Sequence, residues 1–509
     1  MRRNGASSVR RERSIANKRG GIPMNEFSIK RLAECFLTME TNLGLLDEST
    51  YGREARLAWE VSRVPVYSEL RRRLASQGVS HVAKTPLWKM SFRRRLEFMG
   101  SVLLSLVRLN WIRAPRGRRW LVFQHPRLRL HPDGLHEDIY TDDFVSNLKP
   151  DDVNVLVDRC DRAHAQSRRF CVWHNDMTTL LRAVLTFAGW VRFWENQRSI
   201  CLMLCAVQAQ IRDRFGLNLE VHSMVRRRYV DVVRSRIAYG FLLYWLSPAV
   251  VLVVVSYGRP ALILACKSRN IPVIEMQHGV MTKQHLGYSF ARPSARPLAF
   301  PDVFLAFGRY WVDSVDLPIE RTCQFVIGWP HLTDKLGRLS RVKKSQMVFL
   351  SQGPSGTAIA RFALAMTDHV PASVRLIYKL HPGEWRAWRR MYPELVAANE
   401  RGLIDVIEGD SPPLHDILAE SRWQIGVNST ALFEGLALHC QTFILNLPGH
   451  EYMDDLLARG YATLVSHPQD LDLCYEAPPV DSAYMFDPNW RRNLLEFLDS
   501  CPYGRSSTR

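Results

Sequence analysis

The sequence has few of the features that mark a secreted, metal-binding or membrane-spanning protein. Its ten cysteines in 509 residues form no CxxC pair and no Cys/His group with zinc spacing. We therefore expect mostly buried free thiols in a reducing compartment, with no metal site. The longest apolar run, residues 237–257, is broken by Ser247-Pro248, which favours a buried helix followed by a buried strand over a membrane span.

Acidic residues are also scarce, with 50 Asp and Glu against 68 Lys and Arg, a net charge of +18. This excess indicates an anionic partner: nucleic acid, an acidic lipid surface or a phosphorylated substrate. No nucleic-acid-binding motif is present, so nucleic acid is not expected. Residues 1–24 are basic but no apolar core follows them, so we interpret them as a disordered tail and not as a secretion signal.

The basic clusters favour a cytoplasmic protein held peripherally on the inner membrane. Besides the tail they are Arg71–Arg73, Arg93–Arg95, Arg113–Arg119 and Arg226–Arg228, and they suit an anionic membrane surface. The apolar segment Met99–Trp111 is too short to cross a bilayer. It is either a core helix or part of a lipid-facing surface, and both interpretations stay open.

Alternating strand and helix patterns predict an α/β protein with two tandem Rossmann-like domains and an N-terminal helical extension. The expected parts are a basic tail (1–24), a helical extension (25–115), an N-terminal acceptor domain (116–336), a C-terminal donor domain (337–475) and a helical tail (476–509). Short apolar runs predict the strands, Ala249–Val255 most clearly. Ligands bind such sheets at the carboxyl ends of strands, so we expect the active site in the cleft between the two domains.

Two polar motifs follow predicted strands in ways that suit proton transfer or phosphate binding. The first, Glu275-Met-Gln277-His278-Gly279, is followed by His285 and Tyr288. His278 could act as a base in a cleft or could simply form hydrogen bonds within a loop. The second is Lys379-Leu-His381-Pro382, where a helix start and an imidazole could face a phosphate or the histidine could only cap the helix.

Two further motifs are candidates for an anion site. Asn428-Ser429-Thr430 begins a helix that carries Glu434 one turn later. Its hydroxyls and amides could bind a phosphate and Glu434 a ribose, or the group could be an ordinary helix cap. Ser351 and Gly353 lie in a Gly/Ser loop that could approach a phosphate or could be a plain turn.

Taken together, residues 245–450 resemble bacterial glycosyltransferases of the GT-B fold, closest to the capsule polysaccharide, polysialyltransferase and teichoic acid polymerase-like groups. The resemblance implies that His278 is the catalytic or acceptor-side histidine and that Gln277, Gly279, His285 and Tyr288 lie in the same cleft. It further implies a donor phosphate site formed by Lys379, His381, Ser429 and Thr430, with Glu434 on the ribose. The acidic-Gly motif that supplies the base in sialyltransferases has one candidate here, Asp133-Gly134 with Glu137 and Asp138.

We therefore predict a metal-independent glycosyltransferase that needs no cofactor and uses a nucleotide sugar as substrate. Its acceptor would be a cell-surface polysaccharide or a lipid-linked glycan, in capsule or lipopolysaccharide biosynthesis, and its base His278 or Asp138. Three alternatives remain: a CDP-glycerol-type glycerophosphotransferase, a nucleotide-sugar 2-epimerase, and a polyanion-binding protein without enzymatic activity.

Overall fold

A computed structural model describes residues 28–75, 110–125, 128–130, 133–158, 172–291, 296–339, 342–353, 355–474, 478 and 480–500. Residue contacts divide the chain into two compact units. The first unit comprises Met1–Met276, Ser289–Val303 and Leu317–Cys323. The second unit comprises Gln277–Tyr288, Phe304–Asp316 and Gln324–Arg509. The basic tail, Arg93–Arg95 and residues 99–109 lie outside the described residues.

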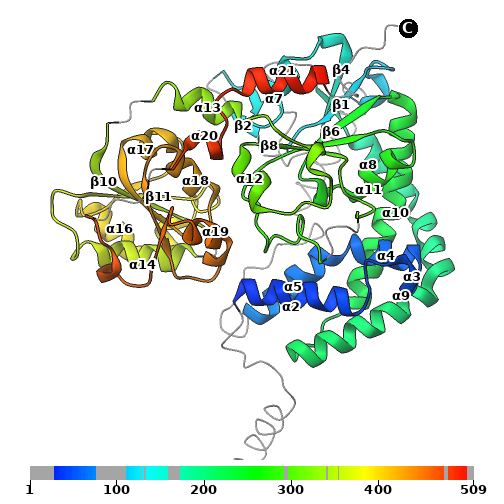
Figure 1. The fold of residues 1–509 in the computed structure, drawn as a ribbon, viewed down its shortest axis with the longest axis horizontal. Coiled ribbons are helices and arrows are strands. Elements are labelled where there is room, and N and C mark those ends of the chain that lie inside the picture. The colour runs from blue at the N-terminus through cyan, green and yellow to red at the C-terminus, as the bar shows by residue number, and fades with distance from the viewer. Residues whose placement is uncertain are drawn as a thin grey trace, which may run out of the picture. The chain divides into compact units, whose positions relative to one another are not determined.

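Four helices begin the described chain, drawn in blue in Figure 1: α2 (Ile29–Asn42), α3 (Glu48–Tyr51), α4 (Arg53–Glu60) and α5 (Arg63–Ala75). Helix α2 begins at Ser28, whose hydroxyl accepts a hydrogen bond from the Arg31 N–H at 3.1 Å. Such a cap satisfies one of the amides that a helix start leaves without a partner. These helices confirm the predicted helical N-terminal extension over residues 28–75.

The first parallel sheet is built from short apolar runs, and its seven strands lie in the order β5-β4-β1-β6-β7-β8-β9. All five residues of β6 are buried, as predicted for a central strand covered on both faces. The strands are β1 (Trp120–Phe123), β4 (Val153–Val157), β5 (Val172–His174), β6 (Val250–Val254), β7 (Val273–Met276), β8 (Val303–Ala306) and β9 (Gln324–Val326). The sequence missed a small antiparallel hairpin between β1 and β4, formed by β2 (Leu128–Leu130) and β3 (His136–Asp138).

The helices around these strands differ from expectation in one place. The sequence pattern over Met177–Val207 predicts a single helix, but the chain forms α8 (Asp176–Val184) and α9 (Thr186–Phe215). At the break, the Thr186 hydroxyl donates to the Ala183 carbonyl at 2.8 Å, a local bond that competes with helical backbone pairing. The other helices are α7 (Asp142–Ser146), α10 (Val221–Leu246), α11 (Pro260–Lys267), α12 (Arg309–Ser314) and α13 (Pro330–Leu336).

The second sheet has six parallel strands in the order β12-β11-β10-β13-β14-β15. In chain order this is 3-2-1-4-5-6, the Rossmann arrangement, and its strand order reverses between β10 and β13. The predicted fold class, α/β with two tandem Rossmann-like sheets, is confirmed. The strands are β10 (Lys344–Leu350), β11 (Arg375–Lys379), β12 (Asp405–Ile407), β13 (Ser421–Gly426), β14 (Gln441–Leu445) and β15 (Thr463–Val465).

Helices pack on this second sheet through a core that includes Phe349, Tyr378, Ile425 and Phe443. The sequence pattern over Trp385–Asn399 predicts one helix, but the chain forms two, with the break before Pro393 because proline has no N–H to continue the helical ladder. The helices of this part are α14 (Gly356–Met366), α15 (Trp388–Met391), α16 (Pro393–Glu400), α17 (Leu414–Glu420), α18 (Thr430–Ala437), α19 (Asp454–Ala458), α20 (Ser482–Met485) and α21 (Trp490–Ser500).

The interrupted apolar run folds as predicted. Helix α10 ends at Leu246, Ser247 adopts a left-handed conformation with φ of 49°, and β6 begins at Val250. No helix within the described ranges has the length and apolarity needed to cross a membrane.

Of the seven cysteines described, only Cys266 and Cys440 are buried, so the expectation of mostly buried thiols is wrong for this part of the chain.

Candidate functional site

The carboxyl edge of the second sheet brings together two of the predicted loops. The loop after β10 contains Gln352, whose side-chain oxygen accepts a hydrogen bond from the N–H of Asn428, after β13, at 3.1 Å. The Asn428 amide donates in turn to the Gly449 carbonyl at 3.1 Å. These bonds lie where the strand order reverses, and open α/β sheets bind ligands at that point.

Helix α18 begins at this same point. The Ser429 hydroxyl caps it by accepting from the Ala431 N–H at 3.2 Å, so its own proton takes no part in the cap. The Thr430 hydroxyl makes no hydrogen bond to any described residue and is half-buried. Free hydroxyl donors and first-turn amides at a helix N-terminus form an anion-binding site.

The His-Gly loop after β7 lies against this helix start. A Cβ placed on Gly279 would be 3.3 Å from the Thr430 hydroxyl oxygen, closer than an ordinary van der Waals contact. Gln277, which is fully buried, fixes the loop by donating to the Gly279 carbonyl and accepting from the Phe307 N–H, both at 2.9 Å. The structure thus places two motifs that are 150 residues apart in sequence side by side.

His278 is half-buried next to a fully buried tyrosine. Its Nδ1 lies 3.3 Å from the Tyr288 hydroxyl. His285 packs on the same tyrosine with ring centroids 5.1 Å apart, and its Nδ1 accepts from the Gly287 N–H at 3.1 Å. His285 therefore orders the loop that positions Tyr288 and His278.

The loop after β11 holds the predicted Lys-x-His pair. Lys379 is buried, and its ammonium donates to the Gly409 carbonyl. Burial lowers the pKa of Lys379, an effect that the charge of Asp410 partly opposes. His381 is exposed, and its Nδ1 accepts from the Gly383 N–H at 3.1 Å. In the neutral ring Nε2 then carries the proton, so that Nε2–H can donate a hydrogen bond to a phosphate oxygen.

A buried carboxylate that sequence reasoning did not single out as functional, Glu384, connects these loops. It accepts hydrogen bonds from the Ser351 hydroxyl at 3.0 Å, the Tyr392 hydroxyl at 2.6 Å and the His381 N–H at 2.8 Å. The Ser351 proton is therefore used inside the protein. Gly353 is exposed, with open space where a Cβ would be. The position of Glu384, three residues after His381, is the one local signal that could have revealed this contact.

Glu434 lies on α18, one turn after Thr430, and is buried. Its Oε2 is 2.8 Å from Nε2 of His415, on α17. Sequence reasoning did not find His415, because nothing local relates α17 to α18.

Asp138 belongs to β3 of the first unit and is 1% exposed. Its carboxylate accepts from the His125 N–H at 2.8 Å, the Tyr140 N–H at 3.0 Å and the Thr141 hydroxyl at 2.7 Å. Burial raises its pKa, which these hydrogen bonds partly oppose. Asp138 thus organises the turn after the hairpin, and its role as a base stays a prediction.

Within the described ranges, no group of three or more His, Cys, Asp or Glu side chains could hold a metal ion. No protein-family profile matches the chain, and no curated protein is significantly similar to it.

The solved structures that are similar to this chain include UDP-GlcNAc 2-epimerases and a rhamnosyltransferase. The UDP-GlcNAc 2-epimerase of Methanocaldococcus jannaschii is 11% identical with a TM-score of 0.43, covering 75% of this chain and 99% of its own. The epimerase of Neisseria meningitidis bound to UDP-GlcNAc is 12% identical with a TM-score of 0.42, covering 74% and 98%. The spinosyn rhamnosyltransferase SpnG is 13% identical with a TM-score of 0.36, covering 76% and 93%. Similarity at this level does not specify a reaction.

Proposed function

We propose that this protein is a glycosyltransferase that moves a sugar from a nucleotide-sugar donor to a glycan or lipid-linked acceptor in cell-surface polysaccharide biosynthesis. One observation carries the proposal: the His278-Gly279 loop lies against the N-terminus of α18 at the reversal point of a Rossmann sheet. Transfer of a sugar from its phosphate requires a base for the acceptor proton and an adjacent anion site for the leaving phosphate.

The donor phosphates bind at the start of α18. Its first-turn amides and the hydroxyls of Ser429 and Thr430 donate to the phosphate oxygens, and the Nε2–H of His381 adds a further donor. These groups stabilise the negative charge that develops on the leaving phosphate as its bond to the sugar breaks. Glu434, one helical turn further on, accepts from the ribose hydroxyls through Oε1.

His278 takes the acceptor proton. When its Nδ1–H donates to the Tyr288 hydroxyl, Nε2 carries the lone pair that a base needs. The acceptor oxygen then forms a bond to the anomeric carbon, the electron pair of the breaking bond leaves with the phosphate, and the hydroxyl proton passes to Nε2. Tyr288 is a positioning residue in this scheme, since it fixes the tautomer and the orientation of the ring.

The test is turnover of a panel of nucleotide sugars and of CDP-glycerol, with and without glycan or lipid-linked acceptors, followed by mass spectrometry of the products. We expect nucleotide release that depends on the acceptor. It should fall by about 10² to 10⁴ in His278→Ala, the usual contribution of a general base. Thr430→Ala should lose about tenfold or more through its missing hydrogen bond to the phosphate. Thr367→Ala, at the end of α14, is the matched control and should keep full activity.

Other outcomes would replace the proposal with one of its alternatives. Altered sugar from the donor without any acceptor would indicate a nucleotide-sugar 2-epimerase. Turnover of CDP-glycerol alone would indicate a glycerophosphotransferase. Salt-sensitive binding to polyanions without turnover would indicate a protein that is not an enzyme.

A further inference from the structure

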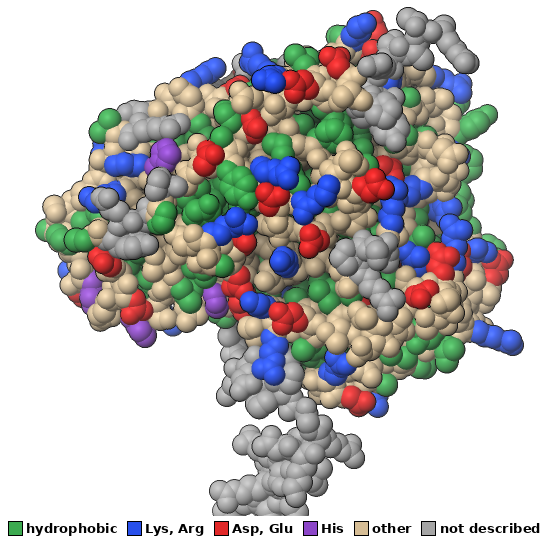
Figure 2. Space-filling view, viewed as in Figure 1, with side chains coloured by type: hydrophobic (Ala, Val, Ile, Leu, Met, Phe, Trp, Pro, Cys, Tyr) green, Lys and Arg blue, Asp and Glu red, His purple; other side chains and the backbone are tan. Residues whose placement is uncertain are grey.

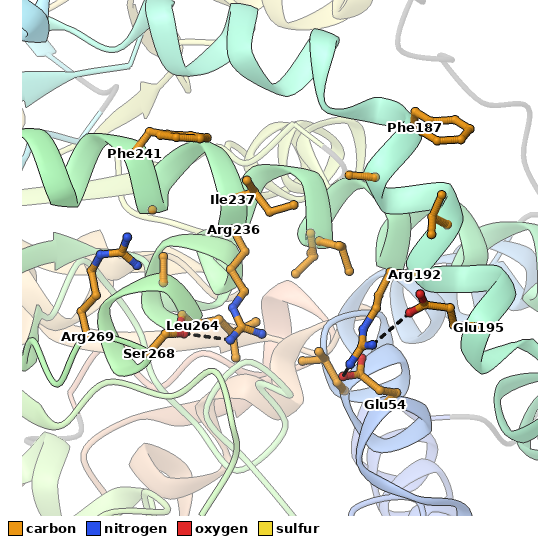
Figure 3. Close-up of a pocket in the computed structure, with 17 residues that line it drawn as sticks. Glu54, Phe187, Arg192, Glu195, Arg236, Ile237, Phe241, Leu264, Ser268 and Arg269 are labelled. Atoms are coloured by element: carbon orange, nitrogen blue, oxygen red, sulfur yellow. Dashed lines mark hydrogen bonds and ion pairs between the residues drawn. The ribbon is translucent and has the colours of Figure 1, made fainter.

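The first unit contains a cavity of about 790 Å³ between its N-terminal and central helices. It lies among α4, α9, α10 and α11 (Figure 3). This volume is within the range that holds small organic ligands. The wall is mostly apolar and is formed by Leu57, Phe187, Ala188, Val191, Val232, Val233, Ile237, Gly240, Phe241, Leu264 and Ala265.

Two of the wall aromatics also project into solvent. Phe187 is 71% exposed and Phe241 is 53% exposed. Helices α9 and α10, together with α8, which precedes α9 in the chain, expose further large apolar side chains: Leu180, Val184, Trp194, Leu202 and Tyr244. Soluble proteins seldom expose so many large apolar residues on neighbouring elements unless the surface meets a membrane or a partner. Tyr and Trp in such a set are typical of the interface between hydrocarbon and water.

The charged residues that line the cavity are three arginines, Arg192, Arg236 and Arg269, and two glutamates, Glu54 and Glu195, and two of the arginines have no carboxylate partner among the described residues. Arg236 donates to the Ser268 hydroxyl at 2.8 Å, and the Arg269 guanidinium lies over Gly240 of α10. Neither forms an ion pair with a described acidic residue. The third arginine, Arg192, is different, because it pairs with Glu54 at 2.9 Å and Glu195 at 3.0 Å (Figure 3).

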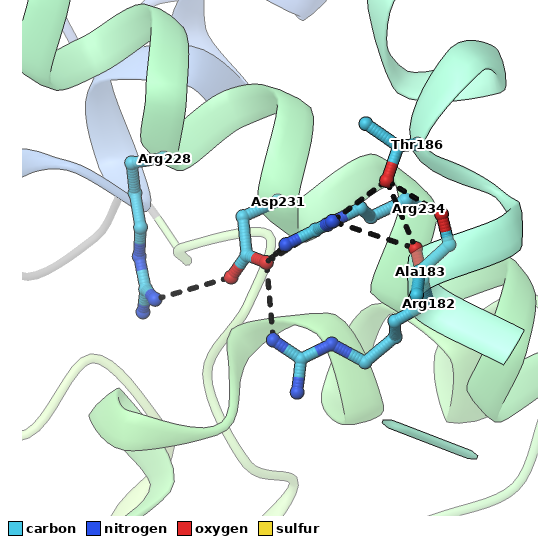
Figure 4. Close-up of polar contacts among 6 residues, drawn as sticks. All are labelled: Arg182, Ala183, Thr186, Arg228, Asp231 and Arg234. Carbon is cyan, nitrogen blue, oxygen red and sulfur yellow. Dashed lines mark hydrogen bonds and ion pairs between the residues drawn. The ribbon is translucent and has the colours of Figure 1, made fainter. Parts of the chain in front are cut away.

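Three other arginines of this region differ from Arg236 and Arg269, because they share one carboxylate partner. Asp231 accepts from Arg182 at 3.0 Å and from Arg234 at 2.8 Å, and Arg228 lies 3.9 Å from its other oxygen (Figure 4). The face drawn in Figure 2 shows basic and acidic side chains interspersed. Because neither pairs with a carboxylate of the described residues, Arg236 and Arg269 are available to an external anion.

We propose that this surface docks on an anionic phospholipid bilayer, with one lipid held in the cavity. The lipid phosphate binds between the guanidinium groups of Arg236 and Arg269, and an acyl chain enters the apolar cavity past Ile237. Phe187 and Phe241 insert into the bilayer beside it. The exposure of these two rings favours a bilayer lipid over a diffusing amphiphile, since a soluble ligand would leave both rings in water.

The experiment is co-sedimentation of the full chain with vesicles of pure phosphatidylcholine and with vesicles that also contain phosphatidylglycerol. We expect binding to the anionic vesicles. The double variant Arg236→Gln/Arg269→Gln should bind them about tenfold or more weakly, since each basic residue near an anionic surface adds to the attraction. Phe187→Ser/Phe241→Ser should bind weakly even at low salt, because the inserted apolar area is lost.

The matched control is Arg492→Gln/Leu495→Ser on α21, which changes one exposed arginine and one exposed apolar residue elsewhere and should bind as wild type. Circular dichroism confirms that each variant is folded. Hydrogen exchange on adding anionic vesicles should slow in residues 187–194 and 236–244. Wild-type binding by both double variants would overturn the proposal and assign docking to the basic N-terminal segments. Binding of a short-chain lipid phosphate without vesicle binding would also overturn it.

Discussion

The imidazole of His415 lies between a lysine and a carboxylate, with its Nε2 2.8 Å from Oε2 of Glu434. On the other side, Nδ1 is 3.4 Å from the ammonium of Lys335. An ammonium can only donate, so Nδ1 accepts and the neutral ring carries its proton on Nε2, toward Glu434. The same ammonium lies 3.0 Å from Nε2 of His331. His415 therefore fixes one oxygen of Glu434 and leaves the other for a ligand.

Removing His415 should weaken donor binding more than it slows the chemical step. In His415→Ala we expect the KM for the donor to rise about tenfold, the effect of one lost hydrogen bond to a charged group, with a smaller change in kcat. His415→Asn, whose side-chain amide can still donate, should recover part of the loss. Steady-state kinetics over a range of donor concentrations measure both constants. An unchanged KM in His415→Ala would show that Glu434 does not bind the donor.

Gly279→Ala tests the contact between the His-Gly loop and α18. The added methyl group would lie 3.3 Å from the Thr430 hydroxyl oxygen, so the loop or the hydroxyl must shift. A misplacement of about 1 Å near reacting groups can cost about 10²-fold in rate, so this smaller shift should lower turnover by less than that. Gly258→Ala, whose methyl group would meet only Val255 at 3.6 Å, is the control. Equal turnover in the two variants, with equal melting temperatures, would refute the role given to this contact.

The depressed pKa of Lys379 predicts an alkaline limit to donor binding. Its protonated form attracts the donor phosphate, so affinity falls as the pH rises through the pKa of the folded state. Burial lowers that pKa, and the fall should therefore begin at a lower pH than for an ordinary lysine. In Lys379→Arg the fall should move to higher pH, because arginine keeps its charge. Donor affinities measured between neutral and alkaline pH that follow the same curve in both proteins would contradict a phosphate-binding Lys379.

The N-terminal helices should contribute strongly to stability through one ion pair. Arg63 and Glu40 are each 1% exposed, and the guanidinium donates to both carboxylate oxygens at 2.7 and 2.8 Å. Glu40→Ala leaves Arg63 buried without its partner, so the free energy of unfolding should fall by about 3–5 kcal/mol. Glu69→Ala breaks surface pairs with Arg72 and Arg73 and should cost at most about 1 kcal/mol for each. Urea unfolding compares the two, and equal losses would contradict this account.

The strands were predictable where burial on both faces produces continuous apolar runs, as in Val250–Val254. Short strands with mixed exposure, such as Thr463–Val465, gave no such signal. The break at Leu185 coincides with the hydrogen bond of the Thr186 hydroxyl to the Ala183 carbonyl. The break at Tyr392 is caused by Pro393, and the helical periodicity of the sequence continues across both breaks.

The site motifs were predictable because polar residues directly after buried strands must collect at one edge of a sheet. The contacts between loops were not. Two such contacts are Glu434 with His415 and Gln352 with Asn428. These residues become neighbours because of the order of the strands, which local sequence patterns do not predict.

The most direct test of the central claim is calorimetric titration of wild type and Thr430→Ala with nucleoside mono- and diphosphates of all common bases. We expect that at least one nucleotide binds wild type and binds Thr430→Ala about tenfold more weakly, through the lost hydrogen bond to its phosphate. We also expect that Thr367→Ala binds that nucleotide as wild type does. Absence of binding by every nucleotide, or equal affinity in wild type and Thr430→Ala, would contradict a donor site at the start of α18.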